Sequence, residues 1–238
     1  MSNKKIIIFD LDDTLYCEID YLISAYKEIA MNIETKYFVS NVFPFMLKTF
    51  YDEKNVFEEL NKKYSLDIPV EKYLFQYRNH IPHICLIRET KEVLVTLLKS
   101  ESCILGLLTD GREITQKNKI KALGLEQFIR EENIVISETF GSAKPSLNNY
   151  LYFQQKYDNA EFIYVGDNVN KDFITPNQLN WITICLLDSG KNIHKQDFSL
   201  DSKYLSQYKI SNMKELLKLF NFLEFCINIE KQDTISNK

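Results

Sequence analysis

Residues 6–14 read IIIFDLDDT, and this stretch decides how the chain folds. Its apolar half, Ile6–Phe9, is typical of a short strand that is buried on both faces of a sheet. Asp10 and Asp12 follow at once, and side chains two residues apart in an extended chain project to the same side. The two carboxylates therefore converge where the strand ends, and they repel each other unless a cation or a shared proton intervenes.

The rest of the chain divides into a helical block and a region in which strands alternate with helices. Between residues 18 and 80 apolar side chains recur at helical spacing, and no glycine occurs before Gly106. We expect strands over residues 6–9, 103–108, 133–137, 162–165 and 181–186. We expect helices over residues 18–36, 41–52, 54–64, 70–78, 90–99, 113–122, 146–157 and 212–225, with Pro145 opening the seventh. This alternation predicts a parallel α/β sheet with a helical segment inserted after its first strand.

The composition is that of an ordinary globular protein, and it excludes several kinds of partner. Of the 238 residues 45% are hydrophobic and 26% charged, and the net charge is −4. No basic field points to nucleic acid or to an anionic membrane, and no apolar run approaches the roughly 20 residues that span a bilayer. The five cysteines are far apart and form no C-x-x-C pair, which indicates a reducing compartment. We therefore expect a cytoplasmic protein that binds neither nucleic acid nor membrane.

Polar residues also follow the later predicted strands. The second strand runs into Thr109 and Asp110, and the fourth runs into Asp167, with Asp172 five residues further on. Lys144 stands just before a predicted helix, where a fixed positive charge and the helix dipole both favour a phosphate. In an open α/β sheet ligands bind beyond the carboxyl ends of the strands, so these residues belong to one candidate site. Taken singly, each also fits an ordinary turn or a surface charge.

Taken together, these segments resemble the haloacid dehalogenase superfamily of phosphotransferases. Its pattern is D-x-D-x-[T/V], then a hydrophobic strand ending in Ser or Thr, then a Lys, then G-D with a downstream acid, and all four parts occur here in order. The resemblance covers residue 5 to about residue 219. It implies a Rossmann-like doubly wound parallel sheet, formed by residues 1–16 and 87–238, and an inserted α-helical cap of the C1 subclass, residues 17–86.

The resemblance also implies a chemical role for each aspartate. Asp10 would attack phosphorus and form an aspartyl-phosphate, and Asp12 would protonate the leaving alcohol and then activate water. Mg²⁺ would be held by Asp10, the backbone carbonyl of Asp12, and Asp167, with Asp172 close by or binding through water. The implied function is Mg²⁺-dependent hydrolysis of a small phosphorylated metabolite, either a nucleotide or a sugar phosphate.

The remaining motif residues would bind the phosphoryl group. The Thr109 hydroxyl and the backbone N–H of Asp110 would grip it, and Lys144 would steady both the nucleophile and the phosphate charge. Two positions depart from the family pattern: Asp110 stands where many members have Asn, and Val169 stands where many have Pro. The extra charge at Asp110 is expected to affect substrate fit rather than catalysis. His80 lies where the cap chain returns to the core, and it is a candidate substrate contact as the cap closes.

Other activities on the same core remain as alternatives. Dehalogenases of the superfamily need no metal and lack the second aspartate of the first motif, so Asp12 favours phosphoryl chemistry. A hexose-phosphate mutase is the main alternative, since it shares the core residues. A phosphonatase would need a cap lysine that forms a Schiff base, and no lysine here has that context. A non-catalytic regulator that binds a phospho-ligand is the third class.

Overall fold

The computed structural model describes residues 4–220, and its centre is a six-stranded, wholly parallel sheet. The strand order is β3-β2-β1-β4-β5-β6, so the order reverses between β1 and β4, where a doubly wound sheet binds its ligands. The predicted α/β, Rossmann-like fold is confirmed. The strands are β1 (Lys5–Phe9), β2 (Cys103–Thr109), β3 (Ile134–Ile136), β4 (Glu161–Gly166), β5 (Ile182–Leu186) and β6 (Tyr208–Ile210).

Helices cover both faces of the sheet because the strands are apolar on both sides. In β1, Ile6 and Ile8 face the cluster that contains Phe153 of α8, while Ile7 and Phe9 face the cluster that contains Leu94 of α5. These four residues of β1 are fully buried, as expected for the central strand of a parallel sheet in an α/β protein. The covering helices are α5 (Arg88–Leu98), α6 (Glu113–Ala122), α7 (Ser137–Phe140), α8 (Leu147–Lys156) and α9 (Ile174–Gln178).

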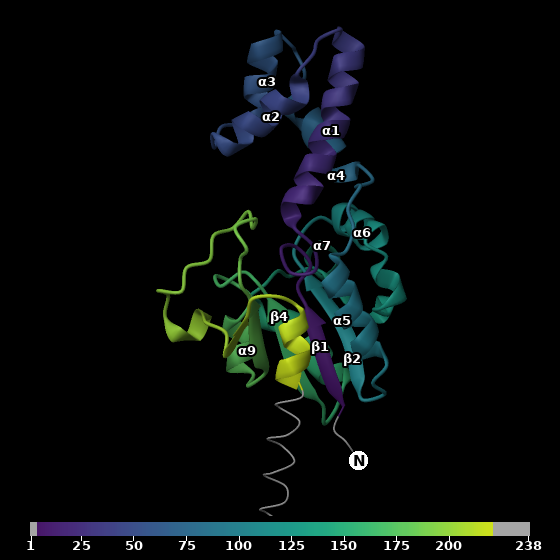
Figure 1. Ribbon diagram of the computed structural model, residues 1–238, viewed down its shortest axis with the longest axis vertical. Helices are drawn as coiled ribbons and strands as arrows, with labels where there is room; N and C mark the ends of the chain where they lie inside the picture. Colours follow the sequence, from purple (N-terminus) through teal and green to yellow (C-terminus); the bar gives the residue numbers. More distant parts are fainter. Residues whose placement is uncertain (1–3, 221–238) are drawn as a thin grey trace, which may run out of the picture.

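A separate group of helices lies between β1 and α5. These are α1 (Glu18–Tyr37), α2 (Val42–Tyr51), α3 (Val56–Tyr64) and α4 (Val70–Asn79). Figure 1 shows them beyond the carboxyl end of β1, with α4 next to α6 and the other three further from the sheet. They share an apolar cluster of their own, in which Phe57 stacks on Tyr73 with ring centroids 5.0 Å apart. The limits of this group as a domain, residues 17 and 86, stay a prediction.

The structure differs from the expected elements mainly at short or polar segments. The strand β6 was not predicted, since it has three residues and pairs only with β5 at the edge of the sheet. Ser137 begins α7 instead of ending the third strand. Pro145 does not occupy the first position of the helix expected over residues 146–157, because Ser146 is the N-cap of α8 and the helix begins at Leu147.

Three short 3₁₀ segments and one further helix complete the described chain. The 3₁₀ segments are Leu125–Gln127, Glu131–Asn133 and Ser202–Tyr204. Residues 214–220 are helical, as predicted for the start of the helix over 212–225, and residues 221–225 lie outside the described residues. Within residues 4–220, no helix has the length and apolar character needed to cross a membrane.

Candidate active site

The ends of β1, β2 and β4 meet at one cavity of about 200 Å³. The strand ends converge because the strands are parallel and adjacent in the order β2-β1-β4. The cavity is lined by Asp10, Asp12, Asp13, Glu18, Thr109, Asp110, Asp167, Asn168, Lys171 and His194. Five of the predicted site residues are in this lining. Of the other two, Lys144 forms an ion pair with Asp10, and Asp172 forms an ion pair with Lys144.

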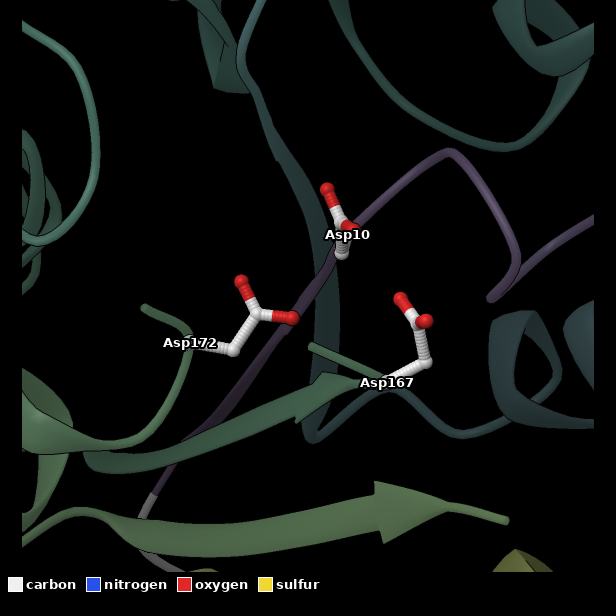
Figure 2. A group of neighbouring side chains, drawn as sticks. All are labelled: Asp10, Asp167 and Asp172. Atoms are coloured by element: carbon white, nitrogen blue, oxygen red, sulfur yellow. The ribbon is translucent and has the colours of Figure 1, made fainter. Parts of the chain in front are cut away.

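Three buried aspartates form the candidate metal centre. Asp10, Asp167 and Asp172 each offer a carboxylate oxygen, and these oxygens lie within 4.8 Å of one another (Figure 2). Burial raises the pKa of Asp10 to about 7, although the charge of Lys144 opposes the shift. Burial, reinforced by the charges of Asp10 and Asp172, raises the pKa of Asp167 to about 9. In the absence of a cation these buried carboxylates resist ionisation. A hard divalent cation such as Mg²⁺, which prefers oxygen ligands, would compensate their charge.

Lys144 is the counter-ion of this cluster. Its Nζ lies 2.7 Å from Oδ1 of Asp10 and 2.8 Å from Oδ1 of Asp172, and its side chain is fully buried. Burial would lower the pKa of Lys144, but the charges of Asp10 and Asp172 raise it well above its ordinary value. The ammonium is therefore a permanent positive charge beside Asp10. A further hydrogen bond, 3.2 Å to the hydroxyl of Tyr164, holds it in place.

Gly166 allows Asp172 to reach the cluster. A Cβ at this position would overlap the carboxylate of Asp172, which packs directly against the glycine at the end of β4. Asp172 also accepts a hydrogen bond of 2.9 Å from the backbone N–H of Asn168, which closes the loop after the strand. The sequence G-D followed by an acid five residues later therefore needs its glycine for steric reasons.

Asp12 lies in the same cavity as Asp10 but has different partners. Its carboxylate accepts hydrogen bonds from Tyr16 at 2.5 Å, Lys119 at 2.7 Å and Gln116 at 3.1 Å. Burial would raise the pKa of Asp12, but the charge of Lys119 and these hydrogen bonds outweigh it, and the pKa is lowered. Without a metal Asp12 is thus the more readily ionised of the two carboxylates, which suits a general base.

Thr109 and Asp110 stand at the end of β2. Thr109 is fully buried and its hydroxyl oxygen accepts a hydrogen bond from Gln116. The Asp110 carboxylate accepts a hydrogen bond of 3.0 Å from the backbone N–H of Lys144 and lies 3.1 Å from Nζ of Lys171. The extra negative charge that the sequence places here is therefore paired within the protein.

Sequence reasoning missed a loop, residues 192–196, that is hydrogen-bonded to Asp167 of the candidate metal centre. The Nδ2 of Asn192 donates a hydrogen bond of 2.9 Å to Oδ2 of Asp167, and Gln196 donates one of 2.8 Å to the backbone oxygen of Asp167. The N–H of Ile193 donates to Asp13 at 3.0 Å, and its side chain packs against the apolar cluster of α1–α4. The loop thus links Asp167 to the base of the helical segment.

His80 is not among the residues that line the cavity. Its ring is buried against Tyr21, with centroids 4.6 Å apart, and its Nδ1 lies 2.9 Å from the backbone oxygen of Tyr77. In this arrangement His80 packs the junction between the helical segment and the core. Its contact with substrate in a closed state stays a prediction.

Known proteins resemble this chain over most of its length. Residues 7–185 match the family model described as haloacid dehalogenase-like hydrolase. A glyceraldehyde 3-phosphate phosphatase of Methanocaldococcus jannaschii is 29% identical over 235 residues, which cover 92% of this chain and 98% of that protein. A protein of the same name from Pyrococcus furiosus is 27% identical over 242 residues, which cover 92% of this chain and 94% of that protein.

Solved structures support the same assignment at the level of the fold. The HAD-hydrolase YfnB of Bacillus subtilis, bound to magnesium, has a TM-score of 0.66 and is 19% identical, and the match covers 92% of this chain and all of that one. The curated relatives are phosphatases, and the family model spans the whole set of site residues from Asp10 to Asp172. This chain therefore belongs to the haloacid dehalogenase-like hydrolase family, and it is a phosphatase.

Proposed function

We propose that this phosphatase is Mg²⁺-dependent and hydrolyses a small sugar phosphate through an aspartyl-phosphate on Asp10. The observation that carries the proposal is the arrangement around Asp10. Its carboxylate faces the cavity while Lys144 lies 2.7 Å away, and Asp167 and Asp172 complete a group of oxygens within 4.8 Å. A carboxylate can approach a phosphate dianion only where such positive charge is fixed beside it.

The reaction proceeds in two steps. In the first, a carboxylate oxygen of Asp10 bonds to phosphorus, and the bond from phosphorus to the leaving oxygen breaks as Asp12 gives that oxygen a proton. In the second, Asp12 takes a proton from water, whose oxygen bonds to phosphorus and displaces the Asp10 carboxylate as inorganic phosphate leaves. The Thr109 hydroxyl, the Asp110 backbone N–H and the Lys144 ammonium orient the phosphoryl group in both steps.

The aspartate cluster would hold the metal. Bound by Asp10, Asp167 and the backbone carbonyl of Asp12, with Asp172 nearby, Mg²⁺ would neutralise charge on the phosphoryl oxygens. The three carboxylates fit this cation because all their donors are oxygens and because burial raises the pKa of both Asp10 and Asp167.

The size of the cavity favours a small substrate. Pockets for drug-sized ligands have volumes of roughly 300–1,000 Å³, and the cavity here is about 200 Å³. A three-carbon sugar phosphate suits that volume better than a nucleotide does. The curated relatives are named glyceraldehyde 3-phosphate phosphatases, so this compound is the first substrate to test.

The helical segment is the proposed gate. We assign residues 17–86 to the cap, whose closing would exclude bulk water while phosphate is transferred.

We propose that the protein is cytoplasmic. Its free cysteines among the described residues suit a reducing compartment; they are Cys17, Cys85, Cys103 and Cys185.

The test is a panel of phosphomonoesters, including glyceraldehyde 3-phosphate, a hexose phosphate and a nucleotide, with and without Mg²⁺. We expect release of inorganic phosphate that needs the metal and that falls at least about a thousand-fold in Asp10→Asn. The exposed Asp158 supplies the control, since Asp158→Asn removes the same charge far from the cavity. Full activity in Asp10→Asn would refute the mechanism, and an isomerised sugar phosphate in place of free phosphate would favour the mutase.

A further inference from the structure

Two polar residues on the inner face of α6 hold the carboxylate of Asp12. Gln116 and Lys119 are three residues apart in the helix, so they share a face, and only 1% and 3% of their surfaces are exposed. Figure 1 shows α6 beside the carboxyl end of the sheet, close to the base of the helical segment. Neither residue belongs to the family pattern that identifies the site.

The two oxygens of the Asp12 carboxylate are bonded differently. Oδ1 accepts hydrogen bonds from the Tyr16 hydroxyl at 2.5 Å and from Lys119 Nζ at 2.7 Å. Oδ2 accepts one bond only among the described residues, 3.1 Å from Gln116 Nε2. Because Asp12 also lines the cavity, Oδ2 is the oxygen that remains available to a substrate.

Lys119 is itself held in one place. Its Nζ lies 4.5 Å from the centroid of the Tyr21 ring, so an aromatic face and a carboxylate enclose it. A buried ion pair is weak evidence of a role in stability, because a pair of apolar residues of similar size often stabilises a protein at least as well. The burial of Lys119, with its charge directed at one oxygen of Asp12, is therefore better explained by a role in orienting the Asp12 carboxylate.

We propose that Lys119 is a positioning residue, which fixes Oδ1 of Asp12 and so aims Oδ2 at the leaving oxygen of the substrate. The inference rests on the proposed acid–base role of Asp12. In the first step the proton moves from Oδ2 to the leaving oxygen, as the bond from phosphorus to that oxygen breaks and the bond to Asp10 forms. Tyr16 shares the task, since its hydroxyl binds the same Oδ1.

The proposal predicts a dependence on the leaving group. Phenyl phosphate and 4-nitrophenyl phosphate have nearly the same shape, but the nitro group stabilises the departing oxyanion and makes its protonation less important. The measurement is the single-turnover release of the phenol from the full chain with Mg²⁺, which isolates the first step. General acid catalysis contributes about 10²–10⁴-fold, so misdirecting Oδ2 is expected to remove about tenfold or more for phenyl phosphate.

We therefore expect Lys119→Met to slow phenyl phosphate at least about ten times more than 4-nitrophenyl phosphate. Loss of the positive charge alone would favour the protonated form of Asp12, since the charge of Lys119 lowers the pKa of Asp12, and so would not slow phenyl phosphate selectively. Lys119→Arg keeps the charge and a hydrogen-bond donor, so its ratio of the two rates is expected to return most of the way to that of the wild type. Tyr16→Phe keeps the ring and removes only the hydroxyl, so it is expected to shift the ratio in the same direction if Lys119→Met does not fold.

Two reference variants separate the inference from the function beneath it. Lys117→Met changes an exposed lysine of the same helix, which pairs with Glu113 at the surface, and is expected to leave both rates unchanged. Asp12→Asn is expected to show the full leaving-group effect. If Asp12→Asn lacks that effect, the proposed role of Asp12 is wrong. If Asp12→Asn shows it while Lys119→Met and Tyr16→Phe slow both substrates alike, the positioning role is overturned.

Discussion

Removing divalent metal is expected to make the stability of this protein fall as the pH rises from 6 to 8. Burial, reinforced by Asp10 and Asp172, raises the pKa of Asp167 to about 9. Burial also raises the pKa of Asp10 to about 7, against the charge of Lys144. In the unfolded chain an aspartate ionises near pH 4. The metal-free folded protein therefore holds protons that the unfolded chain has lost, so the stability they contribute disappears as the pH rises towards the folded pKa values.

The size of the effect follows from these values. One extra bound proton changes the free energy of unfolding by about 1.4 kcal/mol per pH unit. Asp167 stays protonated across both units, which amounts to about 3 kcal/mol, Asp10 adds about 1 kcal/mol between pH 6 and 7, and Glu18, whose pKa burial raises to about 8, adds about 2 kcal/mol. A change of about 6 kcal/mol is a large part of the roughly 5–15 kcal/mol that stabilises a typical domain.

Urea unfolding at pH 6, 7 and 8 in EDTA measures this dependence, and the same series with Mg²⁺ is the comparison. A bound cation favours the ionised carboxylates, so Mg²⁺ is expected to restore most of the stability lost at pH 8. In Asp167→Asn the free energy of unfolding is expected to fall less steeply with pH, by about 1.4 kcal/mol per pH unit. Burial lowers the pKa of His80, but His80 titrates both in the wild type and in Asp167→Asn, so its contribution cancels when the two slopes are compared. Equal stability of the EDTA-treated protein at pH 6 and pH 8 would refute the reasoning.

Two further changes test the surroundings of the candidate metal centre. Gly166→Ala places a methyl group against the carboxylate of Asp172 and is expected to lower the free energy of unfolding by about 1–3 kcal/mol and to weaken Mg²⁺ binding, as urea unfolding and calorimetry would measure. Unchanged Mg²⁺ affinity would show that Asp172 does not contribute to the site. Asn192→Ala removes the hydrogen bond to Oδ2 of Asp167 and is expected to weaken Mg²⁺ binding by about 10–100-fold, again by calorimetry. Wild-type affinity would mean that the loop does not orient Asp167.

The main features of the fold were accessible because they follow from local patterns. The run Ile6–Phe9 has no polar residue, which is typical of a strand buried on both faces, and the structure places it in the middle of the sheet. The segment β6 has no such pattern. Tyr208 and Lys209 remain partly or fully exposed at the edge, so their pairing depends on β5 and not on an apolar sequence.

The candidate site was accessible to the extent that it lies at strand ends. Parallel strands bring Asp10, Thr109 and Asp167 to one edge without any knowledge of side-chain positions. Gln116 and Lys119 were not found, because a polar pair three residues apart on a helix normally faces solvent. The signal that was present is weak: Gln116 and Lys119 share one side of α6, while the exposed Lys117 and Lys121 lie elsewhere on the helix.

Asp110 shows why a departure from a family pattern cannot be judged from the sequence position alone. An aspartate where many members have Asn adds a negative charge next to an anionic substrate, which by itself would oppose binding. The structure pairs that carboxylate with Lys171, 3.1 Å away and 61 residues later in the chain. The two meet because β1 lies between β2 and β4, so the loops after β2 and β4 face each other across it. Lys171 also lines the cavity, and the pair therefore presents little net charge to the phosphate while keeping a cation within the site.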